Sequence, residues 1–226
     1  MIEALSFGCP VILLGGGDCD LSLLRRMTAQ GWPLVAADGG ANRLLDTEIN
    51  PAAIIGDLDS LQQRSRWESV CPVIQIEEQN TTDFEKCLYQ CKAPLFVALG
   101  FTGKRFDHTL AALHVLHRYV DSRIVALVSD TDVVVVIRGA LYLELPKGIR
   151  LSVYPMERVE FSGSTGLLYP LDNLVMQQGQ SIGCSNSTND NAVSIVPLDR
   201  GTYSVIVPVA EFNSMTRALI QRGQSG

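Results

Sequence analysis

Short apolar runs recur through the first part of this 226-residue chain, and they constrain its fold more than any other feature. The runs are bounded by Gly and Asp and alternate with segments of helical spacing. Runs that are apolar throughout are typical of strands covered on both faces, as in a parallel sheet. The expected strands are 11–14, 34–37, 52–55, 73–76, 95–99, 124–128 and 133–137, and the expected helices are 21–30, 41–46, 82–90 and 107–119. This alternation predicts a doubly wound α/β domain over residues 1–140.

After residue 140 the pattern changes to brief strand candidates separated by Pro, Gly, Asn and Ser. Many short strands with turn residues between them are typical of an antiparallel sandwich or barrel. The candidates cover 141–145, 150–154, 158–161, 167–169, 181–184, 192–197 and 202–207, and an amphipathic segment at 210–220 is expected to be helical. We therefore expect a mostly parallel α/β domain at 1–140, followed by an antiparallel β-sandwich at 141–226.

Charge and cysteine usage exclude several classes of partner. Lys and Arg number 18 against 24 Asp and Glu, a net charge of −6, so no basic surface is expected for a nucleic acid. The six cysteines form no CxxC pair, and no apolar run is long enough for a signal core or a membrane span. We expect a cytoplasmic protein with reduced thiols and no membrane partner.

The run 52–55 ends in Gly-Asp-Leu-Asp-Ser, which places Asp57 and Asp59 two positions apart. In an extended chain such residues point to the same side, so both carboxylates can face one point beyond the strand. Mg²⁺ prefers oxygen ligands and is commonly held by one or two carboxylates. The sequence predicts a Mg²⁺ site here; the alternative is a simple acidic turn.

Residues 82–85 have the form of a helix capping box, Thr-Asp-Phe-Glu. The helix dipole alone favours an acidic residue in this first turn, so Asp83 could have a purely structural role. Because it follows the strand 73–76, it can also join the acidic pair in the same crevice. Lys86 lies one turn further on and could reach a phosphate.

Three glycine-rich stretches follow expected strands: Gly15-Gly16-Gly17, Asp38-Gly39-Gly40-Ala41-Asn42, and the segment from Gly100 to His108. Glycines allow a backbone to approach phosphate closely, and a helix that begins there attracts anions. None of the stretches matches the dinucleotide fingerprint or the Walker A spacing. The third adds Lys104 and Arg105, whose charges complete an anion site, while Asp107 is either a ligand contact or only a helix cap.

Taken in order, the stretches 38–42, 56–60 and 82–86 and the pattern Gly103-x-Arg105-x-Asp107-His108 resemble the thiamine pyrophosphokinase family. The segments 166–171 and 183–186 resemble that family's thiamine-binding segments, so the likeness covers nearly the whole chain. The resemblance implies transfer of the pyrophosphoryl group of ATP to the hydroxyl of thiamine, giving thiamine diphosphate and AMP. It also implies an α/β nucleotide-binding domain followed by a β-sandwich, in a homodimer with shared active sites.

The resemblance further implies roles for individual residues. Mg²⁺ would be held by Asp57, Asp59 and Asp83, which together with Arg105 form the catalytic group. ATP would be bound by Gly16, Asp38, Gly39, Asn42, Lys86, Thr102, Arg105, Asp107 and His108, and thiamine by Gln79, Tyr169, Leu171, Ser185 and Asn186. Either Asp83 or Asp59 could accept the proton of the attacking hydroxyl. Tyr169 stands where many family members carry Trp, the strongest aromatic platform for a cationic ligand.

Three other functions are compatible with parts of this pattern. A pyrophosphokinase could act on a different heterocyclic alcohol, such as a hydroxymethylpterin. A phosphohydrolase could use the same carboxylates on water, and a non-catalytic nucleotide-binding protein could keep the glycines alone. The thiamine-like segments argue against a hydrolase, and the intact carboxylates argue against a silent sensor.

Overall fold

The computed structural model describes residues 4–224, which divide into two compact units. The first unit comprises the described residues up to Val115 together with Leu127–Asp130. The second comprises Leu116–Ala126 and the described residues from Thr131 onward, whereas the sequence pattern set its boundary at residue 140. The division falls within helix α4 (Phe106–Arg118) and strand β8 (Val125–Val128), so each unit is described by itself.

A parallel sheet forms the centre of the first unit, with strand order β7-β2-β3-β4-β5. These strands are β2 (Val11–Leu14), β3 (Leu34–Ala37), β4 (Ala53–Gly56), β5 (Val73–Gln75) and β7 (Phe96–Leu99). Every residue of β2, β3, β4 and β7 is buried, as expected for strands covered on both faces. The prediction of a parallel sheet is confirmed for these strands.

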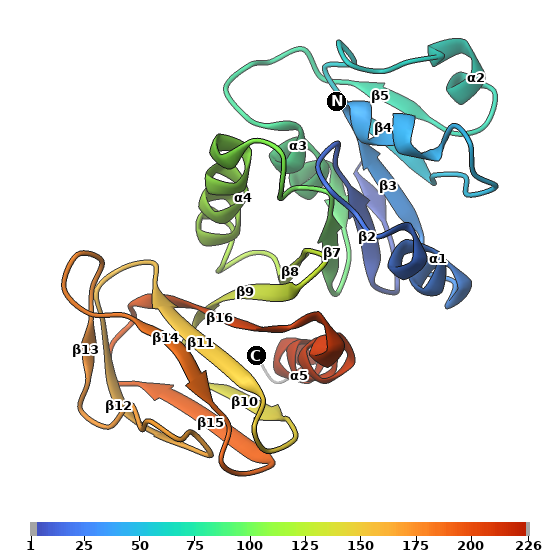
Figure 1. The fold of residues 1–226 in the computed structure, drawn as a ribbon. Helices are drawn as coiled ribbons and strands as arrows, with labels where there is room; N and C mark the ends of the chain where they lie inside the picture. Colours follow the sequence, from blue (N-terminus) through green and yellow to red (C-terminus); the bar gives the residue numbers. More distant parts are fainter. Residues whose placement is uncertain (1–3, 225–226) are drawn as a thin grey trace. The chain divides into compact units, whose positions relative to one another are not determined.

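The chain runs outward from β2 to β5 and then returns to the other side of β2 to form β7. Helix α1 (Leu21–Ala29) lies between β2 and β3 in the chain, and helix α3 (Asp83–Gln90) lies between β5 and β7. Because crossovers between parallel strands are right-handed, this reversal places the two helices on opposite sides of the β2–β3 pair, as Figure 1 shows. The loops after β2, β3, β4 and β7 therefore meet at one edge of the sheet, on both sides of the reversal.

Shorter elements complete the first unit. Helix α2 (Arg64–Glu68) and the parallel pair of β1 (Leu5–Ser6) with β6 (Cys91–Lys92) lie in segments where no element was predicted. The helix predicted at 41–46 is wrong in type and position: a 3-10 helix, η1, spans Asp38–Leu44. It begins earlier because Asp38 adopts a left-handed φ of 42°, which turns the chain as soon as β3 ends.

Two antiparallel sheets form the second unit, with strand orders β14-β11-β16-β9 and β10-β15-β12-β13. The first contains β9 (Asp132–Arg138), β11 (Arg150–Pro155), β14 (Gly183–Ser187) and β16 (Thr202–Pro208). The second contains β10 (Leu141–Glu144), β12 (Val159–Thr165), β13 (Val175–Met176) and β15 (Ala192–Pro197). Their buried faces meet where Phe161 and Tyr203 pack edge to face, with ring centroids 5.2 Å apart.

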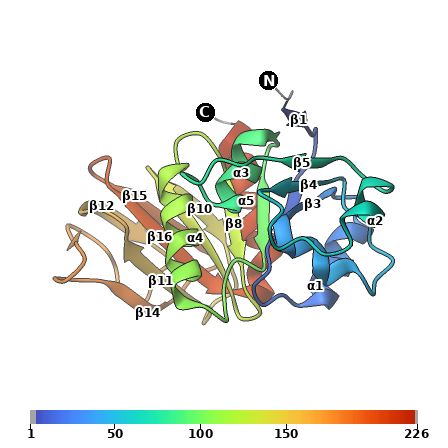
Figure 2. The same cartoon turned by 90° about the horizontal axis from the view of Figure 1, so that it is seen from above.

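The second unit ends in η2 (Val209–Glu211) and helix α5 (Phe212–Gln224), and α5 packs beside β10 (Figures 1 and 2). The helix predicted at 210–220 is therefore confirmed, with later bounds. Antiparallel pairing is also confirmed for this unit. Among residues 4–224, no helix combines the length and apolar character that crossing a bilayer requires.

Two strand predictions need correction. The run 133–137 was grouped with the parallel strands, but β9 pairs antiparallel with β16 in the second unit. Its residues alternate between buried and partly exposed, and Val fills both faces, so the apolar run hid an alternating strand. The strand predicted at 167–169 is reduced to one bridge between Leu167 and Thr188, because Gly166 turns the chain there with a φ of 71°.

Candidate active site

A cavity of about 650 Å³ lies within the first unit at the carboxyl ends of its strands. Its walls come from the loops after β2, β3, β4 and β7 and from the first turns of α3 and α4. This is the position where open α/β sheets bind ligands. Most of the residues that sequence reasoning assigned to metal and ATP line this one cavity: Gly16, Asp38, Gly39, Asn42, Asp57, Asp83, Lys86, Thr102, Arg105 and His108, with Gln79.

Two glycine-rich loops run against each other on one wall. The Gly17 amide donates to the Gly100 carbonyl at 2.6 Å, and the Asp18 amide donates to the Thr102 carbonyl at 3.0 Å. A Cβ on Gly17 would lie 2.5 Å from the Thr102 oxygen, so no side chain fits there. A Cβ on Gly16 would meet nothing within 4 Å, so packing does not explain this glycine, which lines the cavity.

Arg43 stabilises the same wall through hydrogen bonds, and the sequence did not predict this role. From η1, its Nε donates to the Gly17 carbonyl at 2.9 Å, and its Nη2 donates to the same oxygen. Lys104 adds a contact from the other loop, donating from Nζ to the Gly16 carbonyl at 3.2 Å. The side chain of Arg43 thereby ties the loop after β3 to the loop after β2. Nothing in the local sequence pattern predicts this contact, since the two residues are far apart in the chain.

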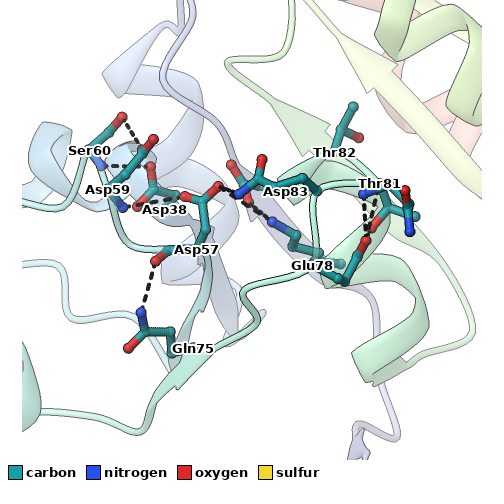
Figure 3. A network of polar contacts seen from close by, with 12 residues as sticks. Asp38, Asp57, Asp59, Ser60, Gln75, Glu78, Thr81, Thr82 and Asp83 are labelled. Atoms are coloured by element: carbon teal, nitrogen blue, oxygen red, sulfur yellow. Dashed lines mark hydrogen bonds and ion pairs between the residues drawn. The ribbon is translucent and has the colours of Figure 1, made fainter.

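Asp38 and Asp57 line the cavity and belong to an acidic cluster that also contains Asp59, which is not among the lining residues (Figure 3). Asp38, Asp57 and Asp59 each offer one carboxylate oxygen, and these oxygens all lie within 4.8 Å of one another. The pairing of Asp57 with Asp59 agrees with the sequence prediction, but the reason given for it is wrong. Leu58 between them has a left-handed φ of 68°, so a turn brings the carboxylates together, and the chain is not extended there.

The carboxylates of this cluster differ in their surroundings. Gln79 donates from Nε2 to Asp57 Oδ2 at 3.0 Å, and this hydrogen bond is the main cause that lowers the pKa of Asp57. Ser60 donates from Oγ to Asp59 Oδ1 at 2.9 Å. Asp38 is 5% exposed, and its burial is the main cause that raises its pKa, with further contributions from the charges of Asp83 and Asp57.

Asp38 also supplies the observation that tests a metal assignment. Its Oδ1 is buried and has no hydrogen-bond partner among residues 4–224. A buried carboxylate oxygen without a partner is unfavourable unless a cation or a water compensates it. With two further carboxylates beside it, the donor set fits a hard divalent cation.

Lys86 separates Asp83 from this cluster. Its side chain is 1% exposed, and its Nζ lies 3.0 Å from Asp83 Oδ1 and 3.7 Å from Asp57 Oδ2. Burial acts to lower the pKa of Lys86, but the hydrogen bond to Asp83 and the charges of Asp83 and Asp57 outweigh it, so the pKa is raised.

The predicted capping box is confirmed, with Thr82 and Glu85 hydrogen-bonded reciprocally at the start of α3.

Arg105, in the loop before α4, forms an ion pair with Asp107, which lies within the first turn of α4 and is therefore not the cap of that helix. The Nε to Oδ1 distance is 3.1 Å and the Nη2 to Oδ2 distance is 2.5 Å, and the side chains are 67% and 64% exposed. The hydrogen bond from Arg105 is the main cause that lowers the pKa of Asp107. Arg105 lines the cavity together with Thr102 and His108, whereas Asp107 is turned toward Arg105 and is not among the lining residues.

Asn42 has a structural task in addition to its predicted role. Its Nδ2 donates to the Ser60 carbonyl at 2.8 Å, and its Oδ1 accepts from the Gln62 amide at 2.8 Å. Both bonds hold the loop that carries Asp57 and Asp59. Both polar atoms of the Asn42 side chain are therefore already hydrogen-bonded to this loop.

Comparisons with known proteins agree on one family. A family model described as "Thiamin pyrophosphokinase, catalytic domain" matches residues 24–128. Thiamine pyrophosphokinase 1 of Oryza sativa subsp. japonica is 30% identical over 194 residues, which cover 71% of this chain and 74% of the relative. The chain belongs to the thiamine pyrophosphokinase family.

Two further relatives extend this result. Thiamine pyrophosphokinase of Bacillus subtilis is 28% identical over 181 residues, covering 75% of this chain and 81% of that protein. The crystal structure of thiamin pyrophosphokinase from Geobacillus thermodenitrificans superposes with a TM-score of 0.75 at 24% identity, over 88% of this chain and 97% of that one. The likeness in structure shows that the thiamine pyrophosphokinase fold extends over both units.

The segments that resemble thiamine-binding segments of the thiamine pyrophosphokinase family lie together in the second unit. Asn186 is 4% exposed; its Oδ1 accepts from the Tyr169 amide at 3.1 Å, and its Nδ2 donates to the Tyr169 carbonyl at 2.6 Å. Tyr169 itself is 64% exposed, and Leu171 is buried. Ser185 adopts a left-handed φ of 61° beside Asn186. The structure therefore brings the two segments together, with Asn186 holding the backbone that presents Tyr169.

Proposed function

We propose that this chain is a thiamine pyrophosphokinase, which transfers the pyrophosphoryl group of ATP to the hydroxyl of thiamine and releases thiamine diphosphate and AMP. The observation that carries this proposal is one cavity lined both by glycine-rich loops at the strand ends and by Asp38 and Asp57 of the carboxylate cluster. Glycine loops suit a polyphosphate, and clustered carboxylates suit the metal that accompanies it. Membership in the thiamine pyrophosphokinase family supports the same reaction.

In this proposal the first unit is a doubly wound nucleotide-binding domain, and the metal is Mg²⁺. Asp57 and Asp59 would hold the metal together with Asp38, whose buried oxygen fits it. Asp83 remains a predicted ligand, although Lys86 lies between it and the cluster. When bound, the metal would neutralise charge on the phosphoryl oxygens, which is the main requirement of phosphoryl transfer.

The chain's own residues would orient the reactants. The backbone at Gly16 and Gly39 and the cation Arg105, all of which line the cavity, would contact the phosphates of ATP, with Thr102 and His108 beside them. Binding of a phosphate by Arg105 would replace its present partner, Asp107. Asp83 or Asp59 would accept the proton of the attacking hydroxyl.

For thiamine, we propose that Tyr169 provides an aromatic face for the cationic ring and that Ser185 and Asn186 contact the aminopyrimidine. Leu171 is buried, so its side chain would support the segment that presents Tyr169. Gln79, at Asp57, would contact thiamine near the transferred group. We further propose a homodimer with shared active sites, in agreement with the exposure of Tyr169. The six cysteines are free in the structure, which supports a cytoplasmic setting.

The test is a product assay with ATP, Mg²⁺ and one alcohol at a time, followed by separation of the nucleotides and the heterocycles. Thiamine should yield AMP and thiamine diphosphate in equal amounts, and the Asp57→Asn variant under identical conditions should yield far less. AMP formation with a hydroxymethylpterin but not with thiamine would favour the related pyrophosphokinase. Phosphate release that is independent of any alcohol would indicate a phosphohydrolase, and no turnover despite ATP binding would indicate a nucleotide-binding protein.

A further inference from the structure

The loop between β5 and α3 is organised by a single carboxylate, that of Glu78. Its Oε2 accepts from the backbone amides of Asn80 at 2.8 Å and Thr81 at 3.1 Å. Its Oε1 accepts from the hydroxyl of Thr81 and from the hydroxyl of Tyr89 at 3.2 Å. Tyr89 lies within α3, so Glu78 ties the loop to itself and to the helix that follows it.

This loop has no regular secondary structure of its own. Ile76 makes the last backbone bond to the sheet, with the Gly56 carbonyl, and α3 begins only at Asp83. Because the sheet and the helix fix only its two ends, the bonds at Glu78 determine the shape of the chain between them. Figure 3 shows Glu78 and Thr81 at one end of a polar network whose other end is the acidic cluster with Asp57.

Gln79 is the next residue, and it connects the two ends of this network. Its Nε2 donates to Asp57 Oδ2 at 3.0 Å, and this bond is the main cause that lowers the pKa of Asp57. Gln79 is exposed, so packing alone does not fix its side chain. The orientation of Gln79 toward Asp57 therefore depends on the backbone that Glu78 holds.

We propose that Glu78, assisted by Tyr89, is a positioning residue that fixes Gln79 against Asp57 in the active site. This proposal rests on the proposed function, because it assigns Glu78 to the same reaction. Glu78 is not a catalytic residue in this scheme: it acts through Gln79. The bonds to Thr81 also hold the residue just before the helix cap Thr82.

A double-mutant cycle tests whether Glu78 acts through Gln79. We compare Glu78→Ala, Gln79→Ala and the double variant, with Glu77→Ala as the matched control. Glu77 is an exposed neighbour without a side-chain hydrogen bond or ion pair among residues 4–224. Displacing a group by about 1 Å can reduce turnover by about 100-fold, so we expect Glu78→Ala to reduce kcat by about 10- to 100-fold. In the Gln79→Ala background, the same change should reduce kcat by less than about 2-fold, because the residue it positions is already absent.

The conservative variant Glu78→Gln provides a rescue. Its amide oxygen can still accept from the Asn80 and Thr81 amides, and its NH₂ group can donate to the two hydroxyl oxygens. We expect its kcat to be within about 3-fold of wild type, and that of Glu77→Ala to be unchanged. An equal loss for Glu78→Ala in both backgrounds, or a kcat equal to wild type for Glu78→Ala, would overturn the proposal.

Hydrogen exchange separates a failure of this inference from a failure of the proposed function. In the protein without ligands, the amides of Asn80 and Thr81 should exchange faster in Glu78→Ala than in wild type or Glu77→Ala. Unchanged exchange would overturn the role of Glu78 even if the enzyme is active. Absence of thiamine diphosphate from the wild-type protein would instead count against the proposed function, and the exchange result would still decide whether Glu78 holds the loop.

Discussion

Replacing Lys86 with Met is the most direct perturbation of the electrostatics of this site. The two side chains have similar length, so the change removes the ammonium group and leaves the packing nearly intact. Lys86 is 1% exposed, and its Nζ lies between Asp83 Oδ1 and Asp57 Oδ2, at 3.0 and 3.7 Å. Without it, Asp57 remains beside Asp38 and Asp59, and both Asp57 and Asp83 lose the positive charge that they contact.

The expected loss of stability follows from two opposing contributions. At an effective dielectric constant of about 20, a pair of unit charges 3.0 Å apart attracts by roughly 5 kcal/mol. Against this stands the penalty for burying the ammonium group, which is several kcal/mol and which Met does not incur. Asp57 and Asp83 are 16% and 32% exposed at their side chains, so water can partly solvate them in the variant. We expect the free energy of unfolding to fall by about 1–3 kcal/mol at pH 7.

The effect should depend on pH in a defined direction. The pKa of Asp57 is lowered below its ordinary value of 3.8, so its stabilising contribution is present above that pH and is lost as the pH falls through the folded-state pKa. The pKa of Lys86 is raised above 10.5, so its contribution is complete at neutral pH and is lost only at alkaline pH, above 10.5. The difference between Lys86→Met and wild type should therefore be largest near pH 7 and should shrink as the pH falls below 3.8, because protonation of Asp57 removes its attraction to Lys86 in the wild type.

Urea unfolding in the presence of a chelator measures this difference. The two tryptophans, Trp32 and Trp67, both lie in the first unit, so their fluorescence reports on the unit that contains Lys86. The matched control is Lys92→Met, which removes an exposed lysine from the same unit and should shift the free energy by less than about 0.5 kcal/mol. Equal midpoints for Lys86→Met and wild type at pH 7 would refute the reasoning, and so would a difference that grows on acidification.

Substitutions at three further residues test the proposed roles by steady-state kinetics. Asp57→Asn should lower kcat on the order of 100-fold with the fold retained, and near-normal turnover at limiting Mg²⁺ would contradict its role at the metal. Arg105→Lys keeps the charge but loses the planar fork, so we expect clearly reduced turnover and a larger reduction for Arg105→Ala; wild-type rates in both would make the loop purely structural. Tyr169→Ala should raise the KM for thiamine by about 3- to 10-fold with little change for ATP, and Tyr169→Trp should preserve it. Hybrid dimers of Tyr169→Ala with Asp57→Asn should exceed both parents in activity if the active sites are shared, and hybrids confirmed by native mass spectrometry that show no recovery would rule the shared site out.

The parallel part of the fold could be predicted from sequence because burial on both faces leaves a direct signature. A strand such as β3 (Leu34–Ala37) is apolar at every position, and only a covered parallel strand needs that. The same rule failed for β9 (Asp132–Arg138), where Val occupies the partly exposed face as well as the buried one. Composition alone does not separate these cases, since the difference lies in the partner strand, β16, which is far away in the sequence.

The candidate site was predictable where chemistry is encoded by neighbours in the chain. Asp57 and Asp59 were found because they are two positions apart, even though the turn at Leu58 brings them together in a different way from the one predicted. Asp38 was assigned to ATP, and its proximity to the pair follows only from the pairing of β3 with β4. Contacts such as that of Arg43 with Gly17 depend on the fold and leave no local pattern.

The charges in the cavity explain why a metal is needed in the proposed reaction. Among the lining cations, Arg105 is paired with Asp107, Lys86 is shared between two carboxylates, and Lys104 donates to the Gly16 carbonyl. A polyphosphate that entered beside Asp38 and Asp57 would meet like charges, which repel it unless a cation is placed between them. We expect the carboxylate cluster to hold a divalent cation in the proposed reaction, because its charge would offset the repulsion between the carboxylates and the phosphates of ATP. ATP binding should therefore be weak in a chelator and should strengthen when Mg²⁺ is added, as calorimetry can measure; equally tight binding in both conditions would refute this inference.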